Sequence, residues 1–146
     1  MLGRTFPLAV VISFATAFSS AFAASNAAPD TTLTVPVSAM HFYQNKEGLT
    51  IANGWGDPAT GEHSNFIKMP GNTASPLHSH SFSYYGVVIN GVVANEPAVN
   101  SPDHPLAAGS YWYQKGGESH VTKCISQTEC LFFVTSKGAF DFSKTK

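Results

Sequence analysis

The chain has 146 residues, with eight lysines and arginines against nine aspartates and glutamates and a formal net charge of −1 at pH 7. Arg4 is its only arginine. Because nucleic-acid binding needs clustered cations, and arginine above all for paired contacts with phosphates and bases, the composition argues against a nucleic-acid partner.

The first 23 residues have the layout of a secretory signal peptide. A positive charge at Arg4 precedes an apolar run over residues 6–18, and the small-residue triplet Ala-Phe-Ala follows at 21–23. The run is short for a membrane span and no stop-transfer charges follow it. We therefore expect cleavage after Ala23, no membrane span in the mature chain, and a periplasmic or secreted protein. Removing 23 of 146 residues leaves 123, which suits one domain.

The rest of the chain has the pattern of an all-β domain. Residues 24–31 offer nothing to bury and are predicted to be a disordered leader, which places the domain at 32–146. Beyond them, short β-branched and aromatic runs alternate with Gly, Pro and Asn breaks, without helical spacing. We predict a β-barrel or sandwich. The predicted strands are LTIANGW (49–55), SNFIKM (64–69), YYGVVI (84–89), SYWYQ (110–114), HVTKC (120–124) and CLFFVTS (130–136).

The longest predicted connection covers about residues 95–105 and contains three prolines. It lies between the strand that follows the paired histidines and the next strand along the chain. Loops of this length in a small domain are usually functional lids or disordered, and the sequence leaves both readings open.

His78 and His80 lie one residue apart in a predicted strand and so share one face, which Phe82 and Tyr84 continue if no bulge intervenes. If that face points into a barrel, two imidazoles lie where an unpaired polar ring is unfavourable. Hydrogen bonds to neighbours and water would satisfy them, but two imidazoles so close favour a shared metal ion. His120, in GSYWYQKGGESHVTKC, offers a third ligand.

The segment around the paired histidines resembles the first motif of the cupin superfamily, a family of small β-barrels that bind a metal between two strand pairs. That motif is a Gly, a His-x-His, a Glu and a second Gly at similar spacing. Here Gly71 is followed by the histidines at 78–80, by Tyr84 and by Gly91. The glutamate of the motif is thus replaced by Tyr84.

The segment around His120 resembles the second cupin motif, which is a Gly, a Pro-x-Gly, a His and an Asn. Gly109 is followed by Lys-Gly-Gly at 115–117, by His120 and by Cys124. Lysine replaces the proline and Cys124 replaces the asparagine. The flanking segments, NGWGDPATGEHSNFIKMPGN and KCISQTECLFFVTSKGAFDF, also resemble exported bacterial single-domain cupins of unknown function.

The resemblance implies a single-domain jelly-roll barrel, the cupin-type double-stranded β-helix, and a homodimer formed through the outer sheet faces. It makes His78, His80 and His120 ligands of a divalent transition metal (Fe, Zn, Mn, Ni or Cu). For Tyr84, three roles are open: phenolate ligation, hydrogen bonding beside the ligands, and wall packing. Three neutral ligands leave the charge of the ion uncompensated, which strengthens it as a Lewis acid.

Glu118 lies two residues before His120 and is the candidate acid or base, with Tyr84 as a second candidate catalytic group; a solvated turn acid is the plainer interpretation of Glu118. Cys124 and Cys130 flank a predicted hairpin turn, so an exported chain could join them in a disulfide. That pairing competes with two buried thiols and with a thiolate role for Cys124 in the pocket. The remaining histidines are expected on the surface or in loops: His41, His63 and His104.

These features predict an exported metalloenzyme that acts on a small neutral or weakly anionic molecule. An oxygenase is the favoured class, and a lyase or isomerase would use the same geometry with another metal. The alternative is a non-catalytic module that binds a small molecule or a metal ion for sensing or transport.

Overall fold

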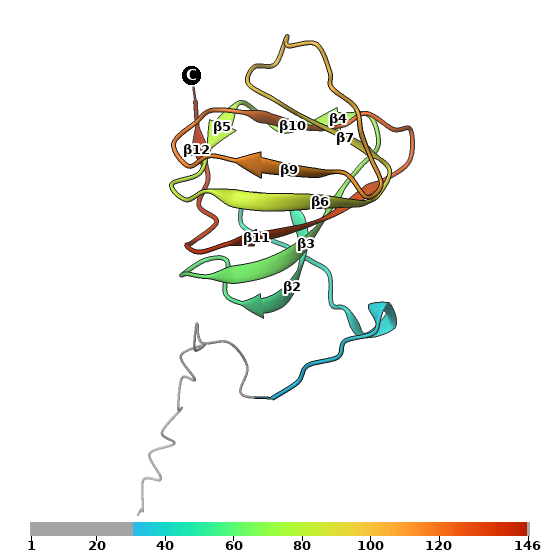
Figure 1. The fold of residues 1–146 in the computed structure, drawn as a ribbon, viewed down its shortest axis with the longest axis vertical. Coiled ribbons are helices and arrows are strands. Elements are labelled where there is room, and N and C mark those ends of the chain that lie inside the picture. The colour runs from blue at the N-terminus through green and yellow to red at the C-terminus, as the bar shows by residue number, and fades with distance from the viewer. Residues whose placement is uncertain (1–30, 146) are drawn as a thin grey trace, which may run out of the picture.

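The computed structural model describes residues 31–145 (Figure 1). The predicted signal peptide (1–23) and all but the last residue of the predicted leader (24–31) therefore lie outside the described residues. Among residues 31–145, no helix is long and apolar enough to cross a membrane.

The described chain is built almost wholly from strands, which confirms the all-β prediction. All six predicted strands are present, and each observed end lies within one residue of the predicted one. The elements are η1 (a 3-10 helix, Val37–Ala39), β1 (Tyr43–Gln44), β2 (Thr50–Gly56), β3 (His63–Met69), β4 (Thr73–Ala74), β5 (His78–Ser79), β6 (Tyr84–Asn90), β7 (Val92–Glu96), β8 (Leu106–Ala107), β9 (Tyr111–Gln114), β10 (Val121–Cys124), β11 (Cys130–Ser136) and β12 (Ser143–Lys144).

The strands form antiparallel sheets that face one another, the arrangement of a jelly roll (Figure 1). The larger sheet has the order β1-β2-β3-β11-β6-β9, and the smaller has the order β4-β10-β7-β8. A third pair, β12-β5, places the C-terminal segment beside the paired histidines. The smaller sheet and β5 lie together at the top of Figure 1, above the larger sheet.

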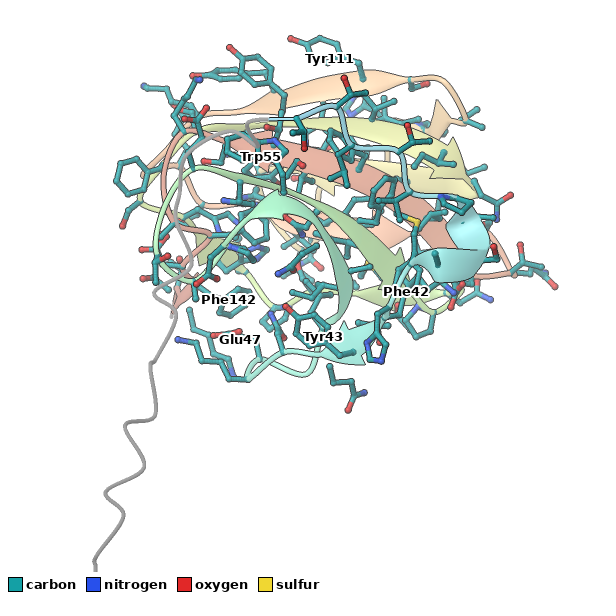
Figure 2. All side chains as sticks on the ribbon, turned by 90° about the horizontal axis from the view of Figure 1, so that it is seen from below. Phe42, Tyr43, Glu47, Trp55, Tyr111 and Phe142 are labelled. Carbon is teal, nitrogen blue, oxygen red and sulfur yellow. A yellow bond between two sulfur atoms is a disulfide. The ribbon has the colours of Figure 1, made fainter. Side chains whose placement is uncertain are left out.

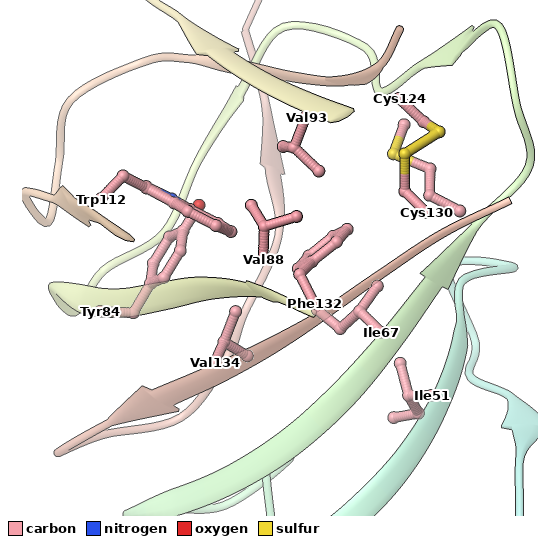
Figure 3. Packing of buried hydrophobic residues seen from close by; sticks show 11 residues of the cluster. Ile51, Ile67, Tyr84, Val88, Val93, Trp112, Cys124, Cys130, Phe132 and Val134 are labelled. Carbon is pink, nitrogen blue, oxygen red and sulfur yellow. A yellow bond between two sulfur atoms is a disulfide. The ribbon is translucent and has the colours of Figure 1, made fainter. Parts of the chain in front are cut away.

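Strand β11 shows how the sequence fills the space between the sheets. Its residues alternate between buried and half-buried, and the inward row includes Phe132 and Val134. Side chains from β2, β3, β6, β7 and β9 pack against that row (Figure 3). Gly86 makes room for Trp112, because a Cβ at Gly86 would lie 2.2 Å from the Trp112 ring.

The disulfide between Cys124 and Cys130 is present, with Cα atoms 5.8 Å apart, which confirms the predicted pairing. It joins the end of β10 to the start of β11 and so connects the two sheets covalently. In Figure 3 it lies at the opposite end of the apolar cluster from Tyr84 and Trp112. A thiolate role for Cys124 is therefore wrong for the oxidised chain.

Strand β7 was not predicted, and it takes up the first two residues of the predicted long connection. The loop that remains, residues 97–105, projects from the smaller sheet (Figure 1). Glu96, the last residue of β7, is buried, and its carboxylate accepts a hydrogen bond from the backbone N–H of His104 at 2.7 Å. Lys123 on β10 pairs with Asp103 at 2.7 Å. The loop is thus anchored at two points on the smaller sheet.

Candidate metal centre

The two histidine motifs meet through backbone pairing at one end of the barrel. His78 on β5 and His120, just before β10, exchange two backbone hydrogen bonds of 3.0 and 2.8 Å. His80, two residues further on, accepts a third from the backbone N–H of Gly117 at 2.8 Å. Segments about forty residues apart in the chain therefore hold the three imidazoles in one place.

The glycines of the second motif make this approach possible. Gly117 has a φ of +79°, which side-chain-bearing residues rarely adopt. A Cβ at Gly116 would lie 2.6 Å from the carbonyl oxygen of Ser81, so only glycine fits there. This turn brings the chain back against the segment that carries His80.

The three imidazoles are buried together, at 5% exposure or less, and one ring nitrogen from each lies within 4.8 Å of the others. The Nε2 atoms of His78 and His80 are 3.1 Å apart. The structure therefore brings together all three histidines that the sequence analysis singled out. No carboxylate joins this cluster among the described residues.

Each Nδ1 atom of these rings faces a backbone carbonyl oxygen. A carbonyl can only accept a hydrogen bond, so we assign the ring proton to Nδ1 in all three histidines. Each Nε2 then presents a bare lone pair, and the same kind of outer hydrogen bond orients histidines that bind metals. The pairs are His78 with Pro76 at 2.8 Å, His80 with Asp141, and His120 with Glu118 at 3.4 Å.

Burial keeps these rings neutral at pH 7. It lowers the pKa of His80 to about 4 and that of His120 to about 3, with a smaller contribution from the neighbouring imidazoles. Burial also lowers the pKa of His78, against a hydrogen bond to Pro76 that raises it. Three neutral nitrogen donors that converge without a proton between them fit a divalent transition metal.

Tyr84 lies beside this cluster with 2% exposure, and its hydroxyl is 3.1 Å from Nε2 of His120. Burial raises the pKa of Tyr84 to about 12, so the phenol keeps its proton and donates it to that nitrogen. Among the three open roles, the contact in the structure is hydrogen bonding beside a ligand. Phenolate ligation stays a prediction.

The other candidate catalytic group, Glu118, presents its backbone to the centre and its side chain to solvent. Its carboxylate is more than half exposed and pairs with Lys115 at 3.0 Å. Its carbonyl oxygen faces Nδ1 of His120. The structure thus places the Glu118 carboxylate outside the cluster, and its role as an acid or base stays a prediction.

The C-terminal segment supplies contacts that the sequence analysis missed. The ring of Phe142 stacks on His78 with centroids 4.4 Å apart, and that of Phe140 stacks on His80 at 4.2 Å. Between them, the Asp141 carboxylate accepts a hydrogen bond from the backbone N–H of Ser81 at 2.7 Å. The alternation in GAFDF, after the last predicted strand, was the available signal, because it places both phenylalanines on one side of an extended chain.

A cavity of about 570 Å³ opens beside the histidines. Its walls are mainly apolar, from Ile67, Met69 and Phe132 among others, and Thr122 and Tyr84 add hydroxyl groups. Glu47 and Phe142, both labelled in Figure 2, belong to its lining. A site of this size and character suits a small molecule with an apolar body.

Two expectations about single residues were wrong. His63 is fully buried on β3, not on the surface or in a loop, whereas His41 and His104 are exposed as expected. Phe82 does not continue the histidine face: residues 81–82 form a bend, and the ring is 49% exposed. The bend was not readable from alternation alone.

Comparison with known proteins establishes the family. Residues 29–143 match the family model described as "Domain of unknown function (DUF4437)". The chain belongs to the DUF4437 family. No curated protein sequence matches this DUF4437 chain.

Solved structures similar to this DUF4437 chain include cupins. The polyketide cyclase RemF from Streptomyces resistomycificus has a TM-score of 0.66 and 14% identity over 80% of this chain and 87% of its own. An RmlC-like cupin from Ralstonia eutropha has a TM-score of 0.60 and 17% identity over 74% and 69%. The DMSP lyase DddQ from Ruegeria pomeroyi has a TM-score of 0.57 and 15% identity over 74% and 62%. The DUF4437 chain therefore has the cupin fold, and the cupins similar to it include enzymes.

Proposed function

We propose that this chain is an exported, metal-dependent cupin enzyme that acts on a small neutral or weakly anionic molecule. The observation that carries the proposal is the convergence of ring nitrogens from His78, His80 and His120, assigned as unprotonated at Nε2, beside an apolar cavity of about 570 Å³. His78, His80 and His120 would hold the metal. When bound, a divalent transition metal supplies Lewis-acid chemistry or, for iron and copper, redox chemistry toward oxygen.

The scarcity of proton-transfer groups favours an oxygenase-type reaction. Apart from the histidines, Tyr84 is the only buried titratable side chain that lines the cavity among the described residues. Its phenol keeps its proton. Lys46, Glu47 and Lys144 are exposed and lie where the cavity meets solvent. A reaction that depends on a strong buried base has no candidate there among residues 31–145, whereas oxygen chemistry does not need one.

The lining also restricts the substrate. Near His78 and His80 the cavity is lined by the stacked rings of Phe142 and Phe140, and its other walls are mainly apolar. Lys46 and Lys144 offer weak attraction for a negative charge, and Glu47 opposes it. A substrate with an apolar or aromatic body and at most one weakly acidic group fits these walls.

Tyr84 is the side chain we expect to act on a proton. Its hydroxyl oxygen lies 3.1 Å from Nε2 of His120, and with the ring proton assigned to Nδ1 the phenol is the donor of this hydrogen bond. With that nitrogen engaged in ligation, the phenol is free to donate to an oxygen atom of the substrate. Its high pKa suits a hydrogen-bond donor better than a base at pH 7.

Export agrees with the predicted signal peptide and with the Cys124–Cys130 disulfide, because disulfides persist in oxidising compartments. A homodimer agrees with the outer face of the larger sheet, where Tyr85, Tyr111 and Tyr113 are about half exposed. Both the compartment and the dimer are part of this proposal.

A non-catalytic binding module is the second candidate. It is favoured by the position of Glu118, whose carboxylate lies outside the cluster with Lys115, and by the replacement of the motif glutamate by Tyr84. Such a module would bind the same metal and the same class of molecule without turnover.

One experiment separates the two. The chain is purified from its native compartment, its metals are measured, and oxygen consumption is followed with phenols and diketones. Bound iron or copper with consumption that His120→Ala abolishes supports the enzyme. Stoichiometric metal without turnover, in the same panel and with lyase or isomerase products also absent, supports the module.

A further inference from the structure

Outside the histidine cluster, four buried side-chain atoms lack hydrogen-bond partners among the described residues, and three of the four belong to Asn65 and His63. Asn65 and His63 lie two residues apart on β3, so they share its inward face, and both have 0% exposure. Neither amide atom of Asn65 has a partner, nor does Nε2 of His63. Because Nδ1 of His63 donates to the carbonyl of Gly61 at 2.9 Å, its Nε2 can only accept.

Asn65 lines a second cavity, of about 390 Å³. The ring of Phe140 separates this cavity from the metal centre: it stacks on His80 at 4.2 Å and meets His63 edge-on at 5.7 Å. Residues 45–47 line both cavities, so both lie under the same turn. Tyr43 and Glu47, labelled in Figure 2, mark the side of the molecule on which the second cavity lies.

The charges around this cavity select the kind of molecule it can take. Its lining includes three acidic residues, Glu47, Asp57 and Asp141, and one basic residue, Lys46. The carboxylates of Asp57 and Asp141 also accept hydrogen bonds from neighbouring residues. An anion would meet net repulsion there, whereas a molecule with N–H donors would not. The flat surfaces of Tyr43 and Phe140 suit a planar group.

We propose that this cavity is a second binding site, for a small planar amide or amidine whose N–H groups donate to Oδ1 of Asn65. An amide would also accept from Nδ2 of Asn65, which would complete both atoms of the buried side chain. The site needs no metal, and so its failure would leave the function proposed for the histidine cluster untouched.

The test compares benzamide, benzamidine and benzoate, which share a ring and differ in the head group. Each is titrated into the metal-bound chain while the side-chain amide signal of Asn65 is followed by NMR. We expect saturable shifts with benzamide and benzamidine, and binding of benzoate weaker by about tenfold or more because its head group lacks donors and repels the carboxylates. No shift, or equal binding of benzoate, would overturn the proposal.

Asn65→Leu removes the amide at nearly constant volume. It is expected to weaken benzamide binding about tenfold and to raise the melting temperature, because an unpaired polar group leaves the interior. Asn90→Leu, at an exposed asparagine, is the matched control and should leave binding unchanged. Unchanged binding in Asn65→Leu, or a crystal structure with benzamide present in which only water contacts the Asn65 amide, would contradict the site. Binding lost in His120→Ala would also contradict it, by placing benzamide at the metal centre.

Discussion

At one end of β10, His120 is held by backbone hydrogen bonds to His78 and by the phenol of Tyr84. At the other end, Cys124 is bonded covalently to Cys130. The first end collects polar, titratable groups around a cavity. The second end is a closed contact of buried sulfur atoms. The difference indicates that a covalent bond fixes the barrel at the disulfide end, while noncovalent contacts hold the candidate metal centre together.

The largest expected effect is loss of the metal in His120→Ala. Removing one of three nitrogen donors leaves two, and we expect metal affinity to fall by about a hundredfold or more. Metal content after dialysis measures the loss. His104→Ala, which changes an exposed loop histidine, is the matched control and should retain the metal. Equal metal content in the two variants would contradict the assignment of ligands.

Acid should destabilise the metal-free protein through the same histidines. Between pH 6.5 and 4, the unfolded chain binds protons at His80 and His120, whereas the folded chain does not, because burial lowers their pKa to about 4 and about 3. Stability therefore falls as the pH falls, by roughly 3 kcal/mol for His80 at pH 4. Urea unfolding at several pH values measures this, and a His80→Phe variant should show a shallower dependence. A wild-type curve that is flat from pH 7 to 4 would refute it.

Breaking the disulfide should affect the barrel and spare the metal centre. Cys124→Ser with Cys130→Ser is expected to lose about 2 kcal/mol of stability, given the short loop that the bond closes. Metal affinity should stay within about twofold of the wild type, because additivity holds between distant sites. Denaturant unfolding and metal titration on the same sample provide both numbers. A large drop in metal affinity would show that the two ends are coupled.

Asp141→Ala should have the smallest effect, and we expect it to change metal affinity without changing the stability of the barrel. Its carboxylate holds Ser81 and so fixes the carbonyl that receives Nδ1–H of His80. Loss of this outer contact is expected to weaken metal affinity about tenfold. Competition with a chelator measures it, and Asp103→Ala, in the loop between β7 and β8, is the control. Equal metal affinities in the two variants would show that the C-terminal segment does not support metal binding.

The sequence was sufficient for the parts of the structure that local pattern controls. Alternation and breaks predicted six of the seven strands of four or more residues, all but β7, and motif spacing singled out His78, His80 and His120 before any contact was known. The contacts of Phe140 and Asp141 with the histidine segment were missed, because they join residues about sixty positions apart. They depend on the pairing of β12 with β5, and a strand of two residues is too short to be predicted from sequence alternation.

Burial of single polar residues was the other gap. His63 follows a turn and begins a strand that alternates imperfectly, so its inward direction depends on pairing with β11 and not on its neighbours in sequence. Tyr84 was found by position in the motif, but its contact with His120 depends on where β6 and the turn before β10 meet. Such contacts are properties of the assembled barrel.

The most direct test is a calorimetric titration of the metal-free chain with zinc, iron(II), manganese, nickel and copper salts, beside the triple variant His78→Ala, His80→Ala, His120→Ala. We predict about one tightly bound ion per wild-type chain for at least one metal, and no such binding in the variant. Binding of none of the five metals to the folded wild-type chain, or equal binding to the variant, would contradict the metal centre.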